Sequence, residues 1–82
     1  MARYVSQRNP ISVASLKRRP VGSVMVRHWA KGEVRFTRVN GGWLAEREDS
    51  VWVRPAEVVS SAAVADECNT AIGCKESWAR VY

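Results

Sequence analysis

Apolar and polar residues alternate along residues 21–54, which is the pattern of β-strands with one buried face. Three turn signals divide this stretch into four short strands. Asn40-Gly41 is the strongest, because both central positions of a type I′ hairpin turn require positive φ. Ala30-Lys31-Gly32 favours a three-residue loop with glycine in the left-handed position, and Glu48-Asp49 favours a third turn. The pattern therefore predicts a four-stranded antiparallel meander.

These turns predict the strand register. The Asn40-Gly41 turn pairs Val39 with Gly42, Arg38 with Trp43, Phe36 with Ala45 and Arg35 with Glu46. The loop at residues 30–32 pairs Val26 with Phe36 and His28 with Val34, and the third turn places Ala45 opposite Trp52.

Since side chains alternate between the faces of a strand, this register defines two faces. The predicted core face carries Val24, Val26, Val34, Phe36, Trp43, Ala45 and Trp52. The predicted outer face carries Met25, Arg27, Trp29, Glu33, Arg35, Thr37, Leu44, Glu46, Val51 and Val53. The outer face either becomes partly buried when the sheet curls or remains an aromatic and arginine surface.

The segment before the meander is basic, and the segment after it contains the predicted C-terminal helix. Residues 1–20 form a basic arm without acidic residues, in which Ser12 caps a short helix that ends before Pro20. Residues 21–82 form a single small β domain. In it, residues 55–59 favour one helical turn after Pro55, and a helix runs from Ser60 or Ser61 to about Ile72.

The apolar stripe of this C-terminal helix, with Val64, Cys68, Ala71 and Ile72, predicts packing on the sheet, and Gly73 ends the helix. Trp78 and Tyr82 make the tail too aromatic to be free, so it docks on the body or contacts a partner. The predicted fold is mainly β with a C-terminal helix, either a small barrel or a curled sheet packed by the helix.

Residues 39–59, VNGGWLAEREDSVWVRPAEVV, resemble the C-terminal half of an SH3-like barrel. Trp43 corresponds to the tryptophan that follows the distal hairpin in that family. Pro55 with Val58 and Val59 corresponds to the closing 3₁₀ turn. The resemblance implies a small β-barrel, a fold whose members bind proteins, DNA or RNA.

Composition limits the chemistry. The 82 residues leave room for one modest core. Neither a metal-ligand cluster nor a cofactor motif is found, and the sole histidine, His28, falls on the predicted core face, so we expect no enzyme.

Cys68 and Cys74 are either a buried and an incidental thiol or a local disulfide. No stretch is long and apolar enough for a membrane span, and we expect a cytoplasmic protein.

Two functions remain, and protein binding is preferred. The chain has four tryptophans, and tryptophan and arginine dominate interface hot spots. The predicted protein interface consists of Trp29, Arg27, Arg35, Met25 and Trp78. Ten arginines, thirteen valines and ten alanines indicate GC-rich coding, as in an actinobacterium or its phages, so a host bacterial protein is one candidate partner. Self-association through the same face is another.

Nucleic-acid binding is the alternative. The net charge is +5, and a basic arm of this kind can follow a phosphate backbone. The residues predicted to bind nucleic acid are Arg3, Arg8, Lys17, Arg18, Arg19 and Arg38. Trp29 or Trp43 would stack on bases. Acidic residues of the meander interrupt this basic surface, which weighs against the alternative.

Overall fold

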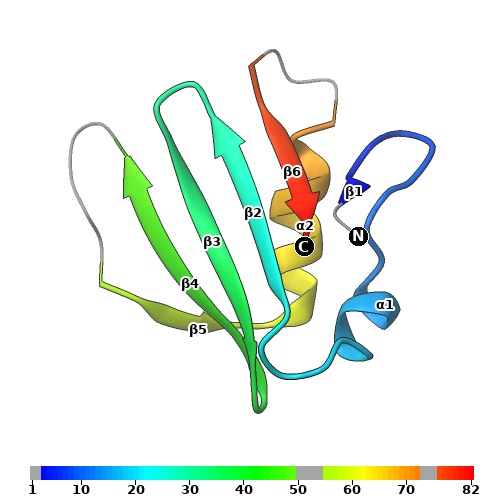
Figure 1. Ribbon diagram of the computed structural model, residues 1–82, viewed down its shortest axis with the longest axis vertical. Coiled ribbons are helices and arrows are strands. Elements are labelled where there is room, and N and C mark those ends of the chain that lie inside the picture. The colour runs from blue at the N-terminus through cyan, green and yellow to red at the C-terminus, as the bar shows by residue number, and fades with distance from the viewer. Residues whose placement is uncertain (1–2, 50–54, 73–75) are drawn as a thin grey trace.

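The structure is a computed structural model that describes residues 3–49, 55–72 and 76–82. Its elements are β1 (Arg3–Tyr4), α1 (Val13–Lys17), β2 (Val24–Trp29), β3 (Gly32–Val39), β4 (Gly42–Asp49), β5 (Glu57–Val59), α2 (Ser61–Thr70) and β6 (Trp78–Val81). The strands form one antiparallel sheet in the order β1-β6-β2-β3-β4-β5 (Figure 1). The described strands do not close into a barrel, because β1 and β5 remain as edges. The chain is thus mainly β with a helix packed on the sheet, as predicted.

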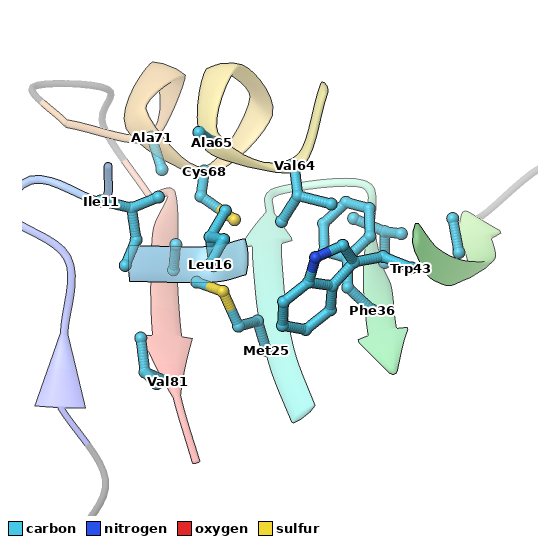
Figure 2. Packing of buried hydrophobic residues seen from close by; sticks show 13 residues of the cluster. Ile11, Leu16, Met25, Phe36, Trp43, Val64, Ala65, Cys68, Ala71 and Val81 are labelled. Atoms are coloured by element: carbon cyan, nitrogen blue, oxygen red, sulfur yellow. The ribbon is translucent and has the colours of Figure 1, made fainter. Parts of the chain in front are cut away.

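The core lies between one face of this sheet and the two helices. Met25, Phe36 and Trp43 point from the strands towards Val64 and Cys68 of α2, and all five are fully buried (Figure 2). Leu16 from α1 completes this cluster. The indole Nε1 of Trp43 donates a hydrogen bond to the Ser61 hydroxyl at 3.1 Å, which satisfies the one polar atom of a buried ring.

The residues before β2 are docked on this core. Ser12 caps α1 by accepting a hydrogen bond from the Ser15 amide at 3.1 Å, and Leu16 of the same helix is completely buried. Ile11 is 9% exposed, and β1 pairs with β6. The predicted short helix is confirmed, and the segment from residue 3 onwards packs against the body of the protein.

The C-terminal helix is also confirmed. Ser60 caps α2 by accepting from the Ala63 amide, and the buried positions of the helix include Val64 and Cys68. The helix ends at Thr70, and the predicted stop at Gly73 lies outside the described residues. The tail docks as expected, since β6 inserts between β1 and β2 (Figure 1).

The register of β3 and β4 is the predicted one, with Arg38 opposite Trp43 and Arg35 opposite Glu46. The turn between them differs in detail. Gly41 has φ of +83°, but Asn40 does not have positive φ. Positive φ at the second central position alone is the mark of a type II turn, so the predicted type I′ turn is wrong while the pairing that it implied is right.

The predicted register of β2 is wrong by one residue. Trp29 pairs with Gly32, so Ala30 and Lys31 form a two-residue turn, and Met25 instead of Val26 lies opposite Phe36. A slip of one residue exchanges the two faces of a strand. Met25 consequently lies in the core, and His28 moves to the opposite face beside Glu33.

Two further expectations are corrected. Glu48 and Asp49 lie within β4, opposite Glu33 and Gly32, and do not form a turn. Residues 57–59 form β5, which pairs with β4, instead of a helical turn. The predicted strand at Val51 and Val53, with Trp52, lies outside the described residues.

Candidate binding face of the sheet

None of the described helices covers the second face of the sheet, which we call the open face. Strand alternation and register assign its side chains. They are Tyr4, Val24, Val26, His28, Glu33, Arg35, Thr37, Val39, Leu44, Glu46, Glu48, Val58, Trp78, Arg80 and Tyr82. The open face lies across the widest part of the molecule (Figure 1).

Four aromatic rings and one arginine gather at one side of the open face, over β1, β6 and β2. We call these residues, Tyr4, His28, Trp78, Arg80 and Tyr82, the aromatic cluster. The Trp78 ring stacks on His28 with centroids 5.1 Å apart and meets Tyr4 edge to face at 5.9 Å. Both are favoured geometries for aromatic pairs. Tyr4 is 55% and Tyr82 50% exposed, so two large rings of the cluster lie at the surface.

Arg80 is the centre of this cluster. Its guanidinium carbon lies 5.3 Å from the Tyr4 ring centroid and 4.9 Å from that of Tyr82, within the range of cation–π attraction. Its Nε is buried without a hydrogen-bond partner, and no carboxylate of the described residues forms an ion pair with it. A guanidinium that is held in place and has no acidic partner can donate hydrogen bonds to a carboxylate from outside the chain.

The other side of the open face is acidic. Glu33, Arg35, Glu46 and Glu48 line a hollow of about 310 Å³ over β3 and β4. Arg35 is the only base among these four residues. The Nδ1 atom of His28 lies 3.9 Å from Glu33 at the boundary between the two sides. The open face therefore carries aromatic and basic groups at one side and carboxylates at the other.

The five residues of the predicted protein interface are not on one surface. Met25 is buried in the core, and the Trp29 side chain packs against the core cluster on the helix-covered face. Arg27 lies 4.9 Å over the Trp29 ring and donates from Nε to the Glu67 carbonyl at 3.2 Å. Arg35 and Trp78 lie on the open face. The one-residue slip in β2 is the physical reason for this split.

Beside α2, Arg27 and Trp29 help to line a groove of about 540 Å³ with Arg47 and Glu67. Arg47 forms a bidentate ion pair with the Glu67 carboxylate, in which Nη2 lies 2.8 Å from Oε2. The hydrogen bonds that Arg47 donates to Glu67 raise the pKa of Arg47 above its ordinary value. The charge of Arg47 is thus compensated within the fold, unlike that of Arg80.

The predicted nucleic-acid residues are not gathered into one surface either. Arg38 donates to the carbonyls of Val39 at 3.0 Å, Gly42 at 2.7 Å, and Lys17 and Arg19 at 3.4 Å each. Its guanidinium therefore ties the end of α1 to the hairpin. Lys17 is the last residue of α1, and Arg18 and Arg19 follow it. Arg8 is exposed in the turn after β1, and Arg3 lies in the edge strand.

The remaining candidates are the two cysteines, a metal site and a membrane-spanning helix. Cys68 is a free thiol in the core, and burial raises its pKa to about 12, so it is a poor nucleophile. The described residues contain no group of three or more side chains that could hold a metal ion. No described helix is long and apolar enough to cross a membrane. Cys74 lies outside the described residues.

Comparisons with protein-family models, with curated proteins and with solved structures gave no match to this chain. The SH3-like resemblance of residues 39–59 stays a prediction. Sequence reasoning missed Tyr4 and Arg80, and it expected Tyr82 to dock or to contact a partner without placing it in the predicted interface. Alternation along residues 78–82 was the available signal, because it places Trp78, Arg80 and Tyr82 on one side of an extended chain.

Proposed function

We propose that this chain is a small, non-enzymatic protein-binding module and that the open face is its binding surface. The observation that carries the proposal is the aromatic cluster, in which exposed tyrosine rings flank an arginine without an acidic partner. Tyrosine, tryptophan and arginine are the residues that contribute most to protein–protein interfaces.

The charge of the open face favours a protein over a nucleic acid. Phosphate backbones bind where basic side chains outnumber acidic ones along a groove. On the open face, Arg35 and Arg80 are accompanied by the carboxylates of Glu33, Glu46 and Glu48. The basic residues at the end of α1 belong to the other side of the sheet. A protein surface can match both signs of charge at once.

Nucleic-acid binding keeps one supporting observation. The exposed rings of Tyr4 and Tyr82 lie on a sheet beside Arg80, an arrangement on which single-stranded bases can stack. Such binding would weaken steeply with salt, because basic side chains that contact phosphates release counterions. Titration of a labelled single strand at two salt concentrations tests this alternative, and an absence of binding at low salt would contradict it.

A photo-crosslinking experiment tests the proposal. The photoreactive residue p-benzoylphenylalanine replaces Tyr82 on the open face, or Val21 as the matched control. Val21 is 64% exposed, and it lies in the turn before β2. We expect a defined polypeptide adduct from position 82 and none from position 21, because only the former position belongs to the binding surface.

The adduct should be lost when Arg80→Ala is added, since that change removes the centre of the cluster. Equal crosslinking at both positions would contradict the proposal. An adduct that nuclease digestion removes would mean that the open face binds nucleic acid and not protein. On the hypothesis of a phage origin, which the arginine and valine excess motivates, a host bacterial protein is one polypeptide that this experiment would identify.

A further inference from the structure

We propose that the partner of the open face is a second copy of the same chain, packed face to face about a two-fold axis. This inference rests on the proposed function, because it names the occupant of that same surface. Its basis is charge complementarity within one face. Arg80 lacks a carboxylate, and the side of the face three strands away supplies unpaired ones.

The register places the relevant residues in one row across the sheet. Tyr4, Arg80, Val26, Arg35 and Glu46 follow one another from β1 through β6, β2 and β3 to β4. Arg80 and Glu46 are thus three strand spacings apart, roughly 14 Å at about 4.8 Å per strand. The midpoint between them lies between Val26 and Arg35.

A two-fold axis that lies between the two sheets, above that midpoint and parallel to the strands, exchanges the two ends of the row. Arg80 of each copy then faces Glu46 of the other. A two-fold interface requires such reciprocal contacts, because the same patch is used by both copies. The rotation gives the guanidinium of Arg80 the carboxylate that its own chain does not provide.

The neighbouring rows also match under this rotation. One row holds Trp78, His28, Glu33 and Glu48, and the row on the other side holds Tyr82, Val24, Thr37 and Leu44. The axis reverses each of these rows onto itself, so Trp78 faces Glu48, and Tyr82 faces Leu44. Tyr82 gains an apolar neighbour, and the Glu48 carboxylate gains the indole N–H of Trp78 as a hydrogen-bond donor.

The size of the face suits such a dimer. The molecule measures 32 × 32 × 21 Å, and the open face lies across the two longer dimensions. A face of that extent offers roughly 800 Å² to each copy, which is the usual contribution to a stable interface. Two sheets packed in this way form a sandwich with about 10 Å between them.

Sedimentation velocity with two charge-reversal variants tests the arrangement. We expect the wild-type chain to be dimeric at roughly 10–200 µM. Arg80→Glu and Glu46→Arg should each raise the dimer dissociation constant by about 100-fold or more, because each places like charges opposite one another twice. An equimolar mixture of the two variants should form a dimer again. In the mixed pair, each new charge faces its opposite and the other Arg80–Glu46 contact is native.

Matched controls carry the same charge changes away from the open face. Arg18→Glu on the segment after α1 and Asp66→Arg on α2 change exposed residues, and both variants should dimerise as the wild type does. Circular dichroism confirms that every variant is folded. Failure of the mixture to dimerise, or equal weakening by Arg18→Glu, would overturn the two-fold arrangement.

The photo-crosslink at position 82 separates failure of this inference from failure of the proposed function. An adduct of twice the chain mass identifies the second copy. A monomeric chain that crosslinks to a different polypeptide overturns the inference and leaves the proposed function standing. A monomeric chain without a position-specific adduct overturns both.

Discussion

The side-chain amide of Asn69 on α2 exchanges two hydrogen bonds with the backbone of Ile11. The Oδ1 atom accepts from the Ile11 amide at 2.9 Å, and Nδ2 donates to the Ile11 carbonyl at 2.8 Å. The two residues are 58 positions apart in the chain. This pair fixes the N-terminal segment to α2 beside the buried Ile11 side chain. It also satisfies two backbone groups that the strands leave unpaired.

Replacement of Asn69 by aspartate should therefore detach the N-terminal segment. The substitution keeps the acceptor but turns the donor into a second acceptor, which faces the Ile11 carbonyl. We expect a loss of about 1–3 kcal/mol in the free energy of unfolding, measured by urea denaturation. Hydrogen exchange at the Ile11 amide should accelerate. Asp66→Asn, an exposed change on the same helix, is the control and should cost less than about 0.5 kcal/mol.

Local turn chemistry explains which part of the sheet was predictable. Gly41 has a positive φ, which favours glycine, so the Asn40-Gly41 turn alone was enough to predict the β3–β4 register. The β2–β3 loop lacks such a marker. Positive φ among the described glycines occurs at Gly22 and Gly41 and not at Gly32, so the expected left-handed residue was absent. Both faces of β2 carry apolar residues, and only contact with the helices selects Met25 for the core.

The aromatic cluster was hard to predict because β6 reverses the usual pattern, in which large side chains such as tryptophan are buried and small ones are exposed. In β6 the small residues Ala79 and Val81 are buried, while the larger Trp78 and Arg80 face outwards. The pairing of β6 between β1 and β2 depends on contacts distant in sequence, which no local pattern encodes. Docking of the tail was predictable from its aromatic content, but its position in the sheet was not.

Gly42 is expected to be essential for the pairing of β5 with β4. A Cβ atom at this position would lie 2.7 Å from the Val59 carbonyl oxygen and 3.0 Å from Val58 Cγ1. Since the first neighbour is backbone, Gly42→Ala should displace β5 and lower the free energy of unfolding by about 1–3 kcal/mol. Gly41→Asn is the matched control in the same turn, because asparagine tolerates the positive φ and a Cβ there meets no atom within 4 Å. Equal losses in the two variants would show that the turn, and not the approach of β5, decides the effect.

The Arg47–Glu67 ion pair should contribute measurably to the attachment of α2. The two side chains are 23% and 27% exposed, so solvent screens the bidentate contact only in part. We expect a double-mutant cycle with Arg47→Met and Glu67→Gln to give a coupling energy of about 1–2 kcal/mol. Urea denaturation of the four proteins provides the values. A coupling near zero would place this pair among the surface salt bridges that add nothing to stability.

Cys68 should make the protein less stable in alkaline solution. The unfolded chain loses the thiol proton near the ordinary value of 9.0, while burial holds the pKa in the folded protein at about 12. Between these values the unfolded state binds fewer protons, so this stabilising contribution is complete below pH 9 and declines as the pH rises. The slope is about 1.4 kcal/mol per pH unit. Because other groups also titrate there, the measurement compares Cys74→Ser with the double variant Cys68→Ala/Cys74→Ser by urea denaturation. The Cys68→Ala chain should show a shallower decline, and identical slopes would mean that the Cys68 thiol ionises as easily in the folded protein as in the unfolded one.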